Sequence, residues 1–218
     1  MKTKLFVALS AALAVSTPAQ AGVTIDAIPG TDPYSGPAPT FTFDPASQPT
    51  ISGGAFVGPG TTDGQFAQPW GTSGMYYSVG PSTSSPGIID LTSFAAISSL
   101  SFIWGSVDNY NYLDVLAGDL STVLVTFDGT DVALPANGDQ FLPATNPLVT
   151  LTFTGADQSA FGGLRLRSSQ NAFEIDNLAV NAPVPEPSTW AMMLFGFGAL
   201  GFAMRRRRKD VKVRFNYA

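Results

Sequence analysis

Residues 99–129 read SLSFIWGSVDNYNYLDVLAGDLSTVLVTFDG, and this stretch decides the fold class. Polar and apolar residues partly alternate over Leu100–Trp104, whereas residues 123–127 form a nearly continuous run of β-branched and apolar side chains. The first pattern is typical of a half-buried strand and the second of a strand in the core of a sandwich. The stretch therefore predicts successive β-strands.

Short runs of the same kind recur on both sides of this stretch, separated by turn-forming residues. The predicted strands cover residues 51–57, 75–79, 95–104, 112–116, 122–127, 148–153, 161–167 and 172–180. Asp128-Gly129 and Asn137-Gly138 are signals of hairpin turns. Because helical periodicity is absent here, we predict an all-β fold over residues 51–182, a β-sandwich of jelly-roll type.

The composition excludes several chemistries. The 218 residues include no His and no Cys, so the chain offers neither imidazole nor thiolate catalysis, no disulfides and no ordinary zinc ligands. Residues 22–187 hold two basic residues, Arg165 and Arg167, against fifteen acidic ones, a net charge of −13. Such a surface repels nucleic acid, and a bound metal would have to be a hard cation such as Ca²⁺.

The first 21 residues have the three regions of a signal peptide. Lys2 and Lys4 are followed by the apolar run Leu5–Val15 and by Ala19-Gln20-Ala21, a small-x-small cleavage pattern. We therefore predict export through the secretion machinery and cleavage by signal peptidase. Residues 22–50 are then predicted to be a Pro- and Gly-rich arm with a first strand.

The C-terminal region has three parts in a fixed order. The tripeptide Pro185-Glu186-Pro187 precedes an apolar run of 15 residues from Trp190 to Met204. A cationic cluster follows, made of Arg205, Arg206, Arg207, Arg208 and Lys209. These parts predict a single transmembrane helix over residues 188–204, with the cations as a stop-transfer signal and residues 210–218 as a cytoplasmic tail.

Residues 183–209 resemble the PEP-CTERM sorting signal of Gram-negative surface proteins, which joins the same three parts. The resemblance implies that exosortase, a membrane protease, recognises the motif at Pro185, Glu186 and Pro187. It also implies an inner-membrane single-pass precursor with a cytoplasmic C-terminus, later sorted to the cell surface. Proteins with this signal accompany exopolysaccharide and biofilm systems, so exopolysaccharide is an expected partner.

Two further segments, residues 104–113 and 164–180, resemble segments that recur in surface proteins with this signal. The FEIDN sequence at 173–177 is also similar to the closing strand of jelly-roll carbohydrate-binding modules. The first segment supplies candidate ligand-binding residues, which are Trp104, Asp108, Asn109, Tyr110 and Asn111. Turns made by the Asp and Asn side chains, with core aromatic residues, are the alternative that we favour.

Glu174 and Asp176 are two positions apart, so on a strand they share one face. A solvated face is the interpretation that we favour. A Ca²⁺ site is the alternative, and Asp108 with Asp114 would form a second acidic cluster. A glycosidase pair is a further alternative, but no second Glu follows at the spacing of the laminarinase-like hydrolases that the segment resembles.

Three functional hypotheses follow, and the first is a non-enzymatic exported surface or matrix protein. The second is a carbohydrate-binding module, which requires an exposed aromatic platform formed by residues such as Trp70, Trp104, Tyr110 or Tyr112. The third is a carboxylate-dependent glycosidase, which requires two carboxylates facing each other across a cleft. We predict that the protein is not an enzyme and needs no cofactor, with Ca²⁺ as the one alternative.

Overall fold

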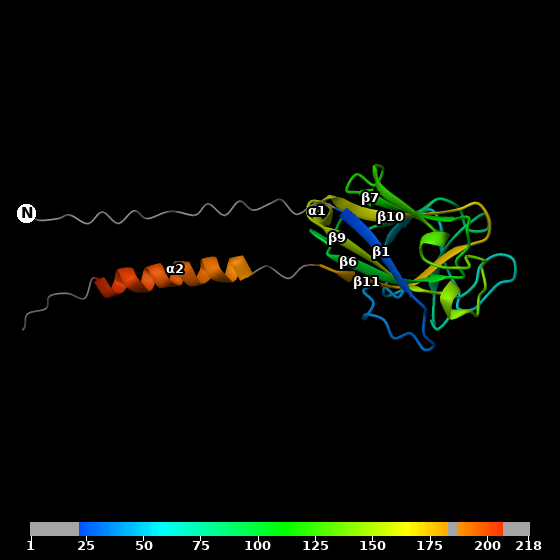
Figure 1. Ribbon diagram of the computed structural model, residues 1–218, viewed down its shortest axis with the longest axis horizontal. Coiled ribbons are helices and arrows are strands. Elements are labelled where there is room, and N and C mark those ends of the chain that lie inside the picture. Colours follow the sequence, from blue (N-terminus) through cyan, green and yellow to red (C-terminus); the bar gives the residue numbers. More distant parts are fainter. Residues whose placement is uncertain (1–21, 183–186, 207–218) are drawn as a thin grey trace, which may run out of the picture. The chain divides into compact units, whose positions relative to one another are not determined.

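A computed structural model describes residues 22–182 and 187–206 of the chain (Figure 1). The strands are β1 (Gly22–Ile28), β2 (Thr50–Ser52), β3 (Ala55–Val57), β4 (Tyr76–Val79), β5 (Gly87–Asp90), β6 (Ser99–Gly105), β7 (Asn111–Ala117), β8 (Val123–Asp128), β9 (Leu148–Thr154), β10 (Phe161–Ser168) and β11 (Phe173–Asn181). The helices are α1 (Asp157–Ala160) and α2 (Pro187–Arg206), and the 3₁₀ turns are η1 (Gly129–Asp131) and η2 (Pro143–Thr145).

The strands form two antiparallel sheets. One has the order β1-β9-β6-β11-β4-β3 and the other the order β2-β5-β10-β7-β8. From β4 to β11, every connection except the β7–β8 hairpin passes from one sheet to the other. This arrangement confirms the predicted all-β sandwich.

All the predicted strand regions contain strands, with differences at their edges. The segment 51–57 divides at Gly53 and Gly54 into β2 and β3, which belong to different sheets. Strand β5 was not predicted because its four residues are too few for a recognisable pattern. The predicted hairpins at 128–129 and 137–138 are wrong, because both turns lie in the β8–β9 connection between the sheets.

The core lies between the inner faces of the two sheets. Trp104 on β6 stacks on Phe173 on β11, with ring centroids 4.2 Å apart and an interplanar angle of 7°, and both side chains are fully buried. The arm also contributes, since Phe43 is fully buried and packs near Tyr77 and Phe56. Every member of the core cluster belongs to residues 22–182, so this part of the chain contains a complete core of its own.

Loop residues cover part of the outer face of the six-stranded sheet, over β4, β6 and β11, whereas outward-facing residues of β1 and β9 are exposed. Tyr76 and Ile103 point away from the main core and are still buried. In the loop between β3 and β4, Phe66 packs edge-on against Tyr76, and Pro69 lies directly over Gly105 of β6. Part of a face that alternation would assign to solvent is therefore a second buried layer.

The close approach at Gly105 yields a stability prediction. A Cβ atom there would lie 2.9–3.0 Å from three Pro69 atoms, so Gly105→Ala must displace the loop. We expect a loss of about 1–3 kcal/mol in the free energy of unfolding, measured by denaturant titration of residues 22–182. Gly118→Ala is the control, since its nearest contact would be 3.9 Å away, and equal losses for both variants would contradict this packing.

The C-terminal unit is described by helix α2 alone. From Met193 to Phe202 the side chains are exposed, and the large apolar ones are 50–77% exposed. In the described ranges 22–182 and 187–206, no helix combines the length and hydropathy that a membrane crossing needs. This finding does not support the predicted transmembrane helix at 188–204.

Several predicted features lie outside the described residues. They are the signal peptide at 1–21, the motif residues Pro185 and Glu186, the cations Arg207, Arg208 and Lys209, and the tail at 210–218. Pro187 begins α2, and Arg205 and Arg206 belong to its last turn.

Candidate functional site

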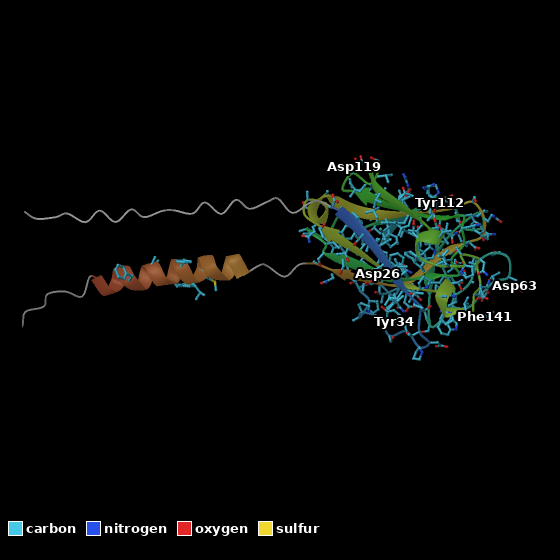
Figure 2. The ribbon with its side chains drawn as sticks, in the orientation of Figure 1. Asp26, Tyr34, Asp63, Tyr112, Asp119 and Phe141 are labelled. Carbon is cyan, nitrogen blue, oxygen red and sulfur yellow. The ribbon has the colours of Figure 1, made fainter. Side chains whose placement is uncertain are left out.

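A polar pocket of about 190 Å³ lies at one end of the sandwich. Its walls come from four loop segments, at residues 62–67, 106–110, 137–140 and 171–174. Figure 2 shows Asp63, in the first of these segments, and Asp119, in the β7–β8 turn, toward opposite ends of the domain. The pocket is thus at the end where β6 finishes and where β7 and β11 begin.

Glu174 lines this pocket and is almost fully buried. Its Oε1 accepts a hydrogen bond from the backbone N–H of Ala67 at 2.8 Å, and its Oε2 accepts one from the Ser106 hydroxyl at 3.1 Å. Burial raises the pKa of Glu174 to about 8, although both hydrogen bonds act in the opposite direction. Burial therefore favours the protonated, uncharged form of this carboxyl group.

Asp108 provides a second carboxyl group in the pocket. The Tyr110 hydroxyl donates to its Oδ2 at 2.5 Å and lies 3.3 Å from the backbone carbonyl oxygen of Asn171. Burial raises the pKa of Asp108, and the bond from Tyr110 partly opposes this rise. A Cβ atom at Gly138 would lie 2.7 Å from both Asp108 oxygens, so a glycine at that position leaves the carboxylate accessible.

Amide side chains complete the lining. Those of Gln65 and Gln140 make no hydrogen bond with the described residues, so they are available to a ligand. The amide of Asn171, by contrast, is engaged with Ser82 and with the carbonyl oxygen of Gly64. The pocket therefore combines carboxyl, hydroxyl and amide groups, and contains no basic side chain.

The five predicted ligand-binding residues separate into two groups. Asp108 and Tyr110 line the pocket, and Asn109 is exposed beside them. Trp104 lies in the core, and Asn111 is buried and donates to the Ser168 hydroxyl at 3.0 Å. The candidate role of these last two in binding is therefore wrong, because the alternation of β6 and β7 turns both inward.

The four candidate rings do not form the exposed aromatic platform that the carbohydrate-binding hypothesis requires, in agreement with the core interpretation that we favoured for Trp104. Tyr112 is 37% exposed, but it lies on the five-stranded sheet, with the Arg167 guanidinium 5.0 Å from its ring centroid. Tyr110 belongs to the pocket and Trp70 is half-buried in the loop between β3 and β4. No described surface therefore gathers these rings as a stacking platform.

The predicted solvated face at Glu174 and Asp176 is wrong, because the loop between β3 and β4 covers it. Asp176 is fully buried, and its Oδ1 accepts from the Asn177 N–H at 2.6 Å. Its Oδ2 has no partner within hydrogen-bond distance among the described residues, although the Thr72 hydroxyl is near enough to moderate the pKa. Burial raises the pKa of Asp176 to about 7.

The Ca²⁺ alternative stays a prediction. Within residues 22–182 and 187–206, no three carboxylates come together as a metal site. The proposed second cluster is wrong, because Asp114 accepts from Arg165 at 2.8 Å and from Arg167 at 2.7 Å on the five-stranded sheet. Burial opposes ionisation of Asp114, but hydrogen bonds from the arginines and Thr126 hold its pKa below the usual value.

The structure therefore joins Glu174 and Asp108, which the sequence placed in separate candidate sites. Gln65 and Gln140 were not predicted at all. Both lie in loops whose composition carries no periodic pattern, and only the fold brings these loops together.

Comparison with known proteins identifies the C-terminal region. Residues 183–208 match the PEP-CTERM protein-sorting motif, so the chain carries this sorting signal. The motif implies export to the cell surface and processing by exosortase, a membrane protein. No curated protein and no solved structure matches the chain.

Proposed function

We propose that this chain is an exported surface protein that exosortase processes and whose β-sandwich serves the exopolysaccharide matrix without catalysing a reaction. The observation that carries the proposal is the sorting motif at residues 183–208, which begins two residues after the last strand. Residues 22–181 form one domain with a complete core, so processing would release a folded unit.

The strand order supports a role at the cell surface. β4-β11-β6-β9 faces β5-β10-β7-β8, which is the pairing of a jelly roll, an architecture found in lectins and carbohydrate-binding domains. The pocket lies at the start of β11, and the chain leaves the domain at the other end of this nine-residue strand, about 26 Å away. A domain attached or released through its C-terminus would thus keep the pocket open to its surroundings.

Cell fractionation of a strain without exosortase tests the sorting step. With an antibody against residues 22–182, we expect the shortened form at the surface or in the medium of the parent strain. In the deletion strain we expect the longer form in the envelope fraction only, because the processing step is missing. Equal release from both strains would contradict the proposal.

A carboxylate-dependent glycosidase is the second candidate, favoured by the presence of Glu174 and Asp108 in one pocket. Binding is the better-supported role, because the Glu174 oxygens accept bonds from Ala67 and Ser106 and Asp108 accepts one from Tyr110. Release of reducing sugar from purified exopolysaccharide, lost in Glu174→Gln, would instead favour the hydrolase.

A further inference from the structure

We propose that the pocket beside Glu174 binds a single sugar unit without negative charge, neutral or amino-substituted, at the end of a glycan chain. This inference rests on the proposed matrix function and specifies its ligand. The cavity of about 190 Å³ is smaller than the pockets that hold drug-sized ligands, so it suits one sugar ring better than a chain segment.

The lining groups suit the hydroxyls of a sugar. A hydroxyl both donates and accepts, and the pocket offers both kinds of partner. The Asp108 carboxylate accepts, and the free amides of Gln65 and Gln140 each supply donors and an acceptor. Because these groups come from three different loop segments, they surround a ligand rather than contact one side of it.

The charges decide which sugars fit. Asp108 is the carboxyl group that the pocket offers to a ligand: burial raises its pKa, and the hydrogen bond donated by the Tyr110 hydroxyl stabilises its ionised form against that effect. Arg165 and Arg167, the basic residues of the described domain, both bind Asp114 on the five-stranded sheet. A uronate, sulfate or phosphate would therefore meet a carboxylate and no cation, whereas an amino group would gain a charge-assisted hydrogen bond.

The positions of the candidate aromatic rings distinguish this site from a groove that binds along a chain. Trp104 lies in the core, and Tyr112 carries the Arg167 guanidinium over its ring. Neither of these two rings is thus available for stacking along several sugars. The pocket can still recognise one terminal sugar unit through hydrogen bonds to its hydroxyl groups, and such bonds are directional and selective.

Calorimetric and NMR titration of residues 22–182 tests this inference with four probes, a neutral hexose, its amino and uronic acid derivatives, and Ca²⁺ alone. We expect uptake of the neutral and amino sugars, and at least about tenfold weaker binding of the uronate. Uronate binding as tight as neutral-sugar binding, or uptake of Ca²⁺ but of no sugar, would overturn the inference.

Single substitutions identify the pocket as the site. Asp108→Asn should weaken amino-sugar binding about tenfold or more and neutral-sugar binding less, because only the charge is lost. Gln140→Ala should weaken both, and the control Asp63→Asn, an exposed carboxylate of the same loop end that does not line the pocket, should change neither. Unchanged binding in Asp108→Asn and Gln140→Ala would overturn the assignment.

Co-sedimentation with the purified exopolysaccharide of the producing cell separates this inference from the proposed function. If both pocket variants still bind the polysaccharide, the matrix role stands and the assignment of the pocket as its binding site is overturned. Failure to bind both the polysaccharide and all the sugars would overturn the matrix role as well. Polysaccharide binding that the pocket variants lose, and that Asp63→Asn keeps, is the expected result.

Discussion

Replacement of Pro185, Glu186 and Pro187 by alanine is expected to abolish processing in cells that contain exosortase. A proline fixes its own φ angle and disfavours helix at the residue before it, and the extended form that this favours is one that a protease can bind. Alanines remove this restraint and favour helix, and the substitution also removes the Glu186 charge. Immunoblots should show the long form alone, with the released form below detection.

Pro183→Ala is the matched control, because it removes a proline from the same segment and keeps the tripeptide intact. Its processing should equal that of the unchanged protein. Normal release of the triple-alanine protein would refute the assignment of these residues as the recognition element. A folding defect would instead be detected as a lower melting temperature of the purified long form of the variant.

The second large effect is a loss of stability with rising pH. Glu174 and Asp176 have pKa values of about 8 and about 7 in the folded protein, raised by burial. Between their ordinary values near 4 and these values, the folded state binds more protons than the unfolded chain. The free energy of unfolding should therefore fall as pH rises from about 4 to 8, by up to ~4 kcal/mol for each group.

Chemical denaturation of residues 22–182 at each pH measures this effect. Glu174→Gln and Asp176→Asn keep the shape of the side chain and remove its ionisation. Each should therefore reduce the decrease of the free energy of unfolding with pH, and should stabilise the domain near pH 8. Asp63→Asn should leave the pH dependence of the free energy of unfolding unchanged, since Asp63 is exposed. A stability that does not vary between pH 5 and 8 would show that the two carboxyl groups are not buried in solution.

Asp114 affects the pH dependence of the free energy of unfolding in the opposite direction. Its folded pKa lies below the ordinary value, so the stability that it provides is present at neutral pH. That contribution is lost as pH falls below about 4, when the bonds to Arg165 and Arg167 disappear. The domain should consequently be most stable at mildly acidic pH, between the two transitions.

Local patterns were enough to predict the fold class and the sorting signal. Alternation and β-branched runs are properties of consecutive residues, so the strands around 99–127 were recognisable without their partners. The sorting motif is likewise contiguous, and the match at 183–208 confirms it. Strand β5 was not predicted because its four residues are too few to show the alternation of a strand.

The predictions for Glu174 and Asp176 show what alternation leaves open. Spacing correctly places both on one face of β11, opposite Phe173 and Ile175. Spacing does not say what covers that face. The loop between β3 and β4 covers it, through Ala67 and its neighbours. The loop is distant in sequence, since Ala67 and Glu174 are 107 positions apart.

The sequence by itself thus determined the all-β class, most strand positions and the identity of the sorting signal, because each depends on neighbouring residues. The tertiary structure decided that Trp104 belongs to the core, that Asp114 pairs with two arginines, and that Glu174 and Asp108 share a pocket. The physical reason is that burial and pKa depend on groups brought together by chain crossings between two sheets. No local pattern encodes these crossings.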